Sequence, residues 1–426
     1  MTEARNPNPM STVSRRAVLG AAAAAAVASS ARTVAAEASP HRLSSLTSSA
    51  QPISVQEREA RIAKVQSLMQ QQRIGAFLIE SGTSLEYFTG VRWHRSERVT
   101  AAIIPASGRT VVVTPFFEQP SVRETLQIDS DVRPWNEDEN PFELIAAAAR
   151  GDAKAGSSLA IEPTTRYYII DGVSKASGPP NLISGDQLVR ACRMVKSPAE
   201  LALMQAANNV TIAALREVHG RVQAGMQPSD LASMMDEATR QLGGSSVEFS
   251  LVLLNEASAY PHGSHQSQTV HPGSVILMDC GCTVHGYQSD ISRTWVFGEP
   301  TKRQREVWDT VKRGQELALE TAALGKPVGS IDKAVRDFYE QRGWRKNYGL
   351  PGLSHRTGHG IGMDGHEAPY LVRNDTTPLA AGMCFSDEPG IYIPGEFGIR
   401  LEDCWYMTSN GPKLFTALAK SIDQPI

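Results

Sequence analysis

The chain has 426 residues, with 42 lysines and arginines against 45 aspartates and glutamates, and its net charge at pH 7 is −3. This near balance argues against a nucleic acid or an anionic membrane surface as a partner. The hydrophobic content of 41% is ordinary for a globular protein, and the length predicts two or three domains in a soluble mature chain.

The first 38 residues have the pattern of an export signal. A twin-arginine pair, Arg15 and Arg16, follows a polar start and precedes a weakly apolar run at 20–27. Small residues around Ala36 and Ala38 offer a cleavage site. The sequence therefore predicts a twin-arginine signal peptide over 1–38 and a periplasmic or secreted protein, with a disordered tail or an uncleaved anchor as alternatives.

Residues 55–190 alternate between helical and strand-like patterns, after a Ser- and Ala-rich stretch at 39–54 that is predicted to be a flexible linker. Apolar residues at helical spacing predict a first helix, with a core face formed by Ile62, Val65, Leu68 and Met69. Further strands and helices are predicted at 75–80, 100–105, 110–114, 142–150 and 158–162. We therefore predict an α/β domain over 55–190, with a hairpin turn at Ser107-Gly108.

This first domain contains no convincing catalytic constellation. Trp93, His94 and Arg95 form a polar-aromatic cluster on a predicted loop. We interpret the cluster as surface packing or a subunit contact. Reach into the active site of a neighbouring subunit is the alternative.

A second unit is predicted over 191–426. Pro198 suits the first turn of a helix and Ser197 can cap it. Helical patterns continue at 199–222, 302–324 and 330–342, another helix is predicted to begin at 228–230, and strand patterns lie at 247–254 and 274–279. Two helix pairs, each followed by strands, hint weakly at a duplicated half.

Four carboxylates and one histidine in this unit could hold metal ions. They are Asp279, Asp290, His359, Glu388 and Glu402. Hard carboxylate oxygens suit divalent cations, and bridging carboxylates offset the repulsion between two neighbouring cations. The pattern therefore predicts a metal site in which two ions are close together.

The predicted strands explain how the acids could meet. Asp279 ends an apolar run, and an acid at the end of a buried strand should not be left unpaired. Glycines at 281 and 286 allow a tight return that brings Asp290 beside Asp279. Pro-Gly turns at 389–390 and 394–395 serve a similar unit that carries Glu388 and Glu402.

These motifs resemble a known metallopeptidase family. The segments 279–294 and 359–369, with the two glutamate motifs, are similar to methionine aminopeptidases, aminopeptidase P and prolidase. The resemblance covers about 190–420 and implies the pita-bread fold, a curved antiparallel sheet with helices on its convex side. Residues 55–190, including Tyr87-Phe88-Thr89-Gly90, resemble the N-terminal domain of the aminopeptidase P, prolidase and creatinase branch. The fold class implied is thus α/β (α+β), with a creatinase-like domain before a pita-bread domain at 191–426.

The resemblance implies a role for each metal-site residue. Asp290 and Glu402 match carboxylates that bridge both metals, and Asp279 matches a ligand of one ion. His359 and Glu388 match the ligands of the other ion, and Glu388 also matches the family's proton-transfer carboxylate. A water or hydroxide between the metals would be the nucleophile.

Other residues match positions around the metals. His262 corresponds to a histidine that contacts the substrate, and His366 to one that polarises the scissile carbonyl. His355 could serve as a proton shuttle, although a structural role is equally open, and Arg400 matches an arginine that orients nearby carboxylates. We assign no role to three further histidines, His265, His271 and His285.

Four of the five cysteines lie near these motifs, namely Cys280, Cys282, Cys384 and Cys404. We interpret them as small buried apolar residues. A disulfide after export is the alternative, and its connectivity cannot be deduced from the sequence.

The resemblance implies a dinuclear metal-dependent exopeptidase that cleaves an Xaa-Pro bond in a small peptide. Manganese is the first choice of ion, with cobalt, zinc or iron as alternatives, because the ligand types do not select one metal. A homodimer is also implied.

Three other functions are weighed against this one. A metal-free hydrolase of the creatinase kind is disfavoured because all five ligand positions are intact, and an inactive binding module would have lost ligands. A non-peptidase enzyme of this fold, a lyase or a C–N hydrolase acting on a small molecule, would keep the metal site. Such lyases often have an added acid two residues after the first aspartate, where this chain has Gly281. Dipeptidase and aminopeptidase specificities are not separated by the sequence.

Overall fold

The computed structural model describes residues 43–151, 158–264, 266 and 268–426. The predicted signal peptide lies outside these residues, as does His265. Within them, no helix is both long and apolar enough to cross a membrane.

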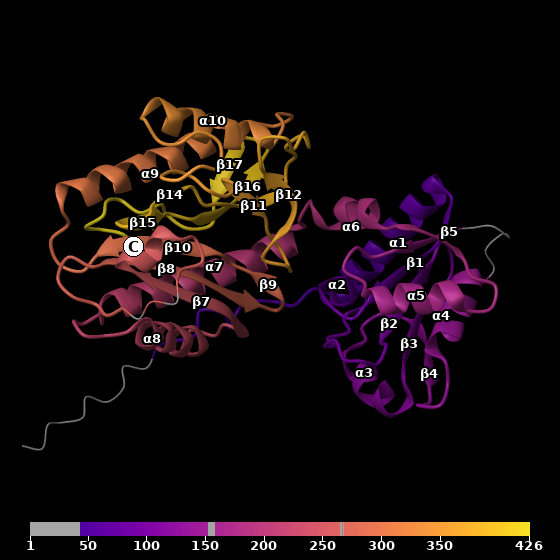
Figure 1. The fold of residues 1–426 in the computed structure, drawn as a ribbon. Helices are drawn as coiled ribbons and strands as arrows, with labels where there is room; N and C mark the ends of the chain where they lie inside the picture. The colour runs from indigo at the N-terminus through magenta and orange to yellow at the C-terminus, as the bar shows by residue number, and fades with distance from the viewer. Residues whose placement is uncertain (1–42, 152–157, 265, 267) are drawn as a thin grey trace, which may run out of the picture. The chain divides into compact units, whose positions relative to one another are not determined.

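The first part of the described chain is built on a mixed sheet of the order β4-β3-β2-β1-β5-β6 (Figure 1). Its strands are β1 (Ile74–Glu80), β2 (Ala101–Pro105), β3 (Thr110–Pro115), β4 (Ser130–Trp135), β5 (Ser158–Ile161) and β6 (Asn181–Ser184). The β1–β2 and β2–β3 pairs are antiparallel, and the other pairs are parallel. The predicted hairpin is therefore confirmed.

Helices accompany this sheet at nearly every connection. They are α1 (Val55–Gln72), α2 (Thr83–Thr89), α3 (Gln119–Thr125), α4 (Pro141–Arg150), α5 (Tyr167–Lys175) and α6 (Asp186–Arg193), with a short 3-10 turn at Phe116–Glu118. Val65 and Met69 of α1 are fully buried, whereas Ile62 and Leu68 are half-buried. The predicted domain boundary at 190–191 falls inside α6, and it stays a prediction.

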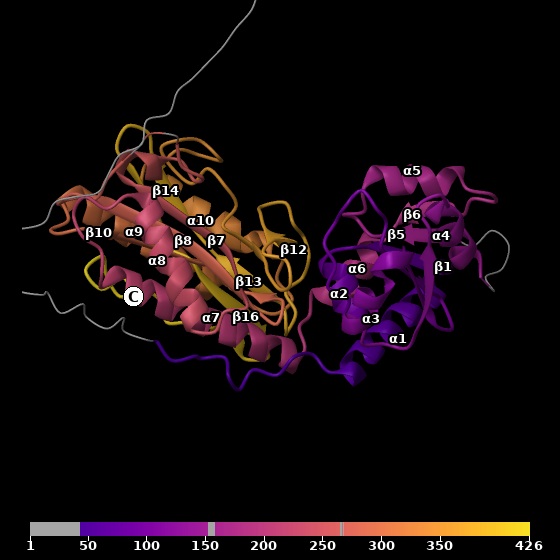
Figure 2. The same ribbon diagram turned by 90° about the horizontal axis from the view of Figure 1, so that it is seen from below.

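The second part begins with two helices that the sequence predicts well. In α7 (Pro198–His219), Ser197 and Glu200 form a capping box, which pairs two backbone N–H groups that the helix itself leaves free. The next helix is α8 (Pro228–Gln241). Both pack on the strands that follow, β7 (Ser246–Leu254) and β8 (Val275–Val284) (Figure 2).

The strands of this part are antiparallel throughout the described residues. One sheet has the order β10-β8-β7, with β9 (Tyr287–Gln288) on β8 and β10 at Ile291–Val296. A second has the order β12-β11-β13-β16-β17, and β14 pairs with β15. The bounds are β11 (Gly358–Gly360), β12 (Glu367–Leu371), β13 (Cys384–Asp387), β14 (Gly390–Ile393), β15 (Phe397–Arg400), β16 (Asp403–Thr408) and β17 (Gly411–Leu414).

Two more helices cover the second sheet, α9 (Lys302–Thr321) and α10 (Gly329–Gln341). Their apolar faces share a core with the sheet, in which Trp308, Tyr339, Phe385 and Trp405 are almost fully buried. The predicted α/β (α+β) class, with antiparallel sheets in the C-terminal part, is confirmed.

Asp279 does not end its strand, contrary to the prediction. It lies in the middle of β8, which continues to Val284 before the chain turns at His285-Gly286, where both residues have positive φ. Gly281 is not a turn residue either. A Cβ at this position would come within 2.6 Å of the Ser289 carbonyl oxygen, so this glycine lets two backbones approach closely.

All five cysteines are buried and unbonded to one another in the structure. Burial raises the pKa of the Cys384 thiol to about 12, which keeps it protonated and unreactive at neutral pH. The interpretation of these residues as small apolar side chains is confirmed, and the disulfide alternative is wrong for this structure.

A fully buried ion pair ties β10 to β16 beside the candidate site. Arg293 donates to both carboxylate oxygens of Asp403, at 2.7 and 3.2 Å, and to the backbone carbonyl of Glu402 at 2.8 Å. Gln315 and Thr416 also donate to this carboxylate. Such a network is costly to break because the remaining charge stays buried without a partner.

We therefore expect Arg293→Met to lower the free energy of unfolding by about 3–5 kcal/mol, measured as a shift of the urea midpoint. The matched control is Arg303→Met, which removes a bidentate pair with Glu396 on the exposed surface of α9. That loss should be at most about 1 kcal/mol. Equal shifts for the two variants would contradict the role of the buried pair.

Candidate metal centre

Strand pairing brings the predicted metal ligands together in the C-terminal part. Asp279 lies in β8, and Asp290 directly precedes β10, which pairs with β8. Glu388 directly follows β13 and Glu402 directly precedes β16, and the β13–β16 register places Asp387 opposite Asp403. His359 is the central residue of β11. Each ligand is therefore held by a rigid strand or by the residue next to one.

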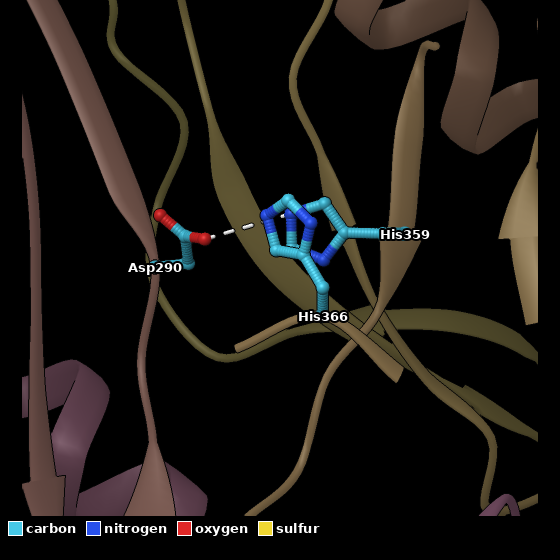
Figure 3. Close-up of side chains that lie close together, drawn as sticks. All are labelled: Asp290, His359 and His366. Atoms are coloured by element: carbon cyan, nitrogen blue, oxygen red, sulfur yellow. Dashed lines mark ion pairs between the residues drawn. The ribbon is translucent and has the colours of Figure 1, made fainter. Parts of the chain in front are cut away.

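Three overlapping groups of side chains offer ligand atoms within 4.8 Å of one another. The groups are Asp279-Asp290-Glu402, His359-Glu388-Glu402 and Asp290-His359-His366. Figure 3 shows the last of them, with Asp290 facing the two imidazole rings. Since the first two groups share Glu402, the donors form two adjacent clusters joined by one carboxylate.

The donor set fits divalent cations because several of its oxygens have no other partner. Asp279 Oδ1, Asp290 Oδ1 and Glu402 Oε1 are buried and accept no hydrogen bond within the described residues. A buried carboxylate oxygen without a partner costs free energy, and a cation would remove that cost. The Nε2 atom of His359 lies 3.6 Å from Asp290 and 3.5 Å from Glu388, and it points into the same group.

The electrostatics of the cluster are those of acids crowded into a dry site. Burial, together with repulsion from neighbouring carboxylates, raises the pKa of Asp290 and of Glu402 well above the ordinary range. Burial raises the pKa of Glu388 to about 8. Without a cation, burial and crowding therefore shift all three carboxyl groups toward their protonated forms.

The histidines of the site favour their neutral forms. Burial lowers the pKa of His359 and of His355 to about 3, and it also lowers the pKa of His366. The rings of His359 and His366 are stacked, with centroids 3.9 Å apart. A neutral imidazole can present a lone pair to a metal or donate a hydrogen bond to a substrate.

Arg400 connects the cluster to its surroundings. Its guanidinium donates to Asp279 at 2.6 Å, to Ser292 at 2.9 Å and to Tyr392 at 3.1 Å. Ser292 in turn donates to Glu402 at 2.7 Å, and the Tyr392 hydroxyl lies 2.7 Å from His355 Nε2. Arg400 thus orients carboxylates on two strands, which is the role that the resemblance implies for it.

Ser292 and Tyr392 are site residues that no motif in the sequence indicates. Tyrosine is common on strands, and a single serine there forms no motif that indicates a site. The only signal in the sequence is their closeness to Asp290 and Glu388 along the chain. Their roles become visible only in the contacts that they make with Arg400.

All nine residues that the sequence analysis placed at the site line one cavity of about 900 Å³. These are His262, Asp279, Asp290, His355, His359, His366, Glu388, Arg400 and Glu402. Phe249, Leu251 and Tyr260 supply an apolar wall, and Arg356 and Glu248 add charged groups. The cavity is large enough for a small peptide. His271, His285 and the Trp93–Arg95 cluster are absent from the described lining.

The site defines a buried metal centre of the kind that activates water and polarises carbonyl groups. Comparison with known proteins agrees with this class. The profile of "Metallopeptidase family M24" matches residues 202–409, and that of "Creatinase/Prolidase N-terminal domain" matches residues 61–195.

Individual relatives extend over most of the chain. An Xaa-Pro dipeptidase of Lactobacillus helveticus is 30% identical over 84% of this chain and 97% of its own length. The crystal structure of dipeptidase PepE from Mycobacterium ulcerans superposes with a TM-score of 0.78 at 30% identity, covering 86% of this chain and 97% of that one. A prolidase structure from Thermococcus sibiricus has a TM-score of 0.78 at 26% identity, with 84% and 97% covered.

The chain belongs to metallopeptidase family M24 and carries the creatinase/prolidase type of N-terminal domain. It is therefore a metallopeptidase, and the predicted family and fold are confirmed. The family implies divalent metal ions, for which the clusters described above supply the ligands.

Metal binding should release protons, because the raised pKa of Glu388, of Asp290 and of Glu402 leaves protons on these groups that a cation must displace. The apparent affinity for Mn²⁺ should therefore rise with pH up to about 8. In the metal-free protein, the stability that comes from Glu388 is fully present below the ordinary carboxyl pKa of about 4.3 and is lost as the pH rises through about 8.

Calorimetric titration of Mn²⁺ in buffers of different ionisation enthalpy measures this proton release. Glu388→Gln should release fewer protons. The control Glu396→Gln removes a surface glutamate and should leave the number unchanged. Binding without proton release would show that the carboxylates are already ionised.

Proposed function

We propose that this protein is a dinuclear metal-dependent exopeptidase that hydrolyses the Xaa-Pro peptide bond of small peptides. The observation that carries the proposal is the set of unpartnered carboxylate oxygens, gathered with His262 and His366 around one peptide-sized cavity. Relatives named Xaa-Pro dipeptidase and prolidase align with this chain over 97% of their own length. Their names support the substrate class.

Two metal positions are supported by the way the donors divide. Asp279 belongs to one cluster, His359 and Glu388 belong to the other, and Glu402 is common to both. Asp290 lies in groups with Asp279 and with His359, so it is the second candidate for a bridging ligand. Two bound cations would lower the pKa of a water molecule and polarise the scissile carbonyl. Manganese remains the first choice, with cobalt, zinc or iron as alternatives.

Glu388 is the best placed group to move a proton. Burial raises its pKa to about 8 in the metal-free cluster, so this carboxyl group binds a proton more readily than an exposed glutamate does. One carboxylate oxygen lies 3.6 Å from His355 Nδ1, and the other faces His359. We assign it the transfer of a proton to the leaving nitrogen, with His355 and Tyr392 as the polar chain behind it.

His366 and His262 are the groups that would contact the substrate. Both are exposed in the cavity, and neither is enclosed by protein atoms as His359 is. A lowered pKa keeps His366 neutral, so that it can donate a hydrogen bond to a carbonyl oxygen as negative charge develops there.

A homodimer stays a prediction.

The alternative of a lyase on the same metal site is disfavoured by the packing around Gly281. A side chain there would meet the Phe249 ring at 2.5 Å and the Ser289 carbonyl oxygen at 2.6 Å. The site therefore has no room for the additional acid that such lyases often have at this position. Only an activity assay distinguishes a peptidase from a C–N hydrolase that acts on a small molecule.

The metal-loaded protein should hydrolyse Ala-Pro, and Asp290→Ala should reduce kcat/KM by at least about 1000-fold because it removes a shared ligand. Metal content by elemental analysis should fall in the same variant. The control is Asp337→Ala, an exposed aspartate of α10 that pairs with Lys333. If the wild-type protein with two bound metals cleaves none of a panel of Xaa-Pro peptides, the peptidase proposal is wrong and the small-molecule hydrolase replaces it.

We also propose export by the twin-arginine route, on the basis of the sequence alone. In a bacterial host with this route, replacing both Arg15 and Arg16 by Lys should retain the chain in the cytoplasm, as measured by cell fractionation. Arg5→Lys serves as the control in the same segment. Unchanged export of the double variant would contradict the signal assignment.

A further inference from the structure

Glu248 is an acidic side chain in the catalytic cavity that does not belong to the predicted metal ligands. It is exposed and lines the cavity wall. Its carboxylate accepts a hydrogen bond from Ser246, and in the part of the chain that the structure describes no cationic side chain pairs with it. The negative charge of this carboxylate is therefore available to a cationic ligand.

A β-bulge turns Glu248 toward the cavity. The β7–β8 register skips Glu248, because Val247 and Phe249 pair with consecutive residues of β8. In a regular strand Glu248 would point to the same side as Ser250, whose hydroxyl donates to Asp236 of α8 at 2.9 Å. The extra residue instead places Glu248 beside Phe249 in the cavity wall.

Glu248 shares one side of the cavity with Gln288 and Gly365. The Ser246 hydroxyl that donates to Glu248 lies 2.6 Å from the hydroxyl of Thr283. Thr283 is paired with Gln288 in the β8–β9 pair. Gln288 and Gly365 both line the cavity, and a Cβ at Gly365 would come within 3.0 Å of Gln288 Oε1.

The proline half of the substrate belongs to another side of the cavity. Glu388, to which we assign proton transfer to the leaving nitrogen, lies 3.6 Å from His355. His355 also lines a second cavity of about 550 Å³, whose lining does not include Glu248 or Gln288. The leaving half therefore extends toward His355, and the residue before proline extends toward Glu248.

The distance along β7 fits a long side chain. Leu251 is paired with Asp279, and Glu248 is three residues away on the same strand, which corresponds to roughly 10 Å. A lysine side chain with its five bonds of about 1.5 Å each spans about 6 Å, and an ion pair adds about 3 Å. The α-amino group of the substrate is only two bonds from the scissile carbonyl carbon, so it stays near the metal cluster.

We propose that Glu248 selects substrates in which lysine or arginine is the residue before proline. The apolar stem of such a side chain would lie on Phe249 and Leu251, and its charged end would pair with the carboxylate. The inference rests on the proposed Xaa-Pro activity and names the substrate class within it. Glu248 is a specificity-determining residue here, and it takes no part in bond cleavage.

The test compares Lys-Pro with Met-Pro in the metal-loaded enzyme, because the two side chains are similar in length and only lysine is charged. Wild-type kcat/KM should be about 5-fold to 20-fold higher for Lys-Pro. Glu248→Gln should bring this ratio close to one, mainly through a higher KM for Lys-Pro. Glu248→Lys should reverse the choice, so that Glu-Pro is cleaved faster than Lys-Pro.

Glu237→Gln is the matched control. Glu237 is an exposed glutamate of α8 that accepts a hydrogen bond from Gln241 at 3.1 Å, and it lies outside the cavity lining. This variant loses the same charge and should keep the wild-type ratio. If Glu248→Gln lowers kcat/KM equally for both peptides, the proposal is overturned. A wild-type ratio near one overturns it too, whereas cleavage of Ala-Pro in the same assay leaves the proposed function standing.

A binding measurement separates this proposal from the proposed reaction. In calorimetry of the metal-loaded protein, L-lysine should bind the wild type at least about fivefold more tightly than L-norleucine does. Glu248→Gln should bind the two amino acids equally. That pattern supports the cation site even if no Xaa-Pro peptide is cleaved, and equal binding of both ligands by the wild type would overturn it. Circular dichroism and metal content of each variant confirm that it is folded and loaded.

Discussion

The rest of this structure depends on the burial of four carboxylates in one small volume. Water can no longer solvate Asp290 and Glu402, and neighbouring acids repel them, so both effects raise the pKa of these two groups. Arg400 balances only part of this charge through its contact with Asp279, and three carboxylate oxygens have no hydrogen-bond partner within residues 43–426 as the structure describes them. A folded chain that retains such a cluster requires either protons or cations, and divalent cations satisfy the cluster at the pH of most cells.

Antiparallel strand pairing brings the four acidic residues together. The β13–β16 register places the residues that follow and precede the two strands, Glu388 and Glu402, side by side at one end of the sheet. On the other side of the cavity, β8 and β10 carry Asp279 and Asp290, and Gly281 permits the close approach of backbones between them. The buried Arg293–Asp403 pair ties the two strand systems together directly behind the acids. The metal centre is thus a property of two sheets, and neither sheet could form it alone.

The charged and apolar side chains around the metal centre decide which substrate the cavity binds. A metal centre of this kind attracts carbonyl oxygen and activates water, but it does not measure the length of a peptide. Arg356, stacked on Tyr370 and without an acidic partner among the described residues, supplies a cation at the margin of the site, while Phe249 and Tyr260 supply apolar surface. The fold is thus shared with the family, whereas specificity depends on a few side chains in the cavity.

Much of this could be predicted from the sequence, because ligand types and local patterns are local properties. The five metal-site residues, the capped helix after Ser197 and the hairpin at Ser107-Gly108 all follow from residue chemistry and spacing. The position of Asp279 within β8 could not be predicted, since an apolar run does not show where a strand ends once both of its faces are buried. The contacts of Ser292, Tyr392 and Arg356 were also beyond the sequence. Their partners lie on other strands, and only tertiary packing decides that Arg400 pairs with the carboxylate of Asp279 while Arg356 stacks on the ring of Tyr370.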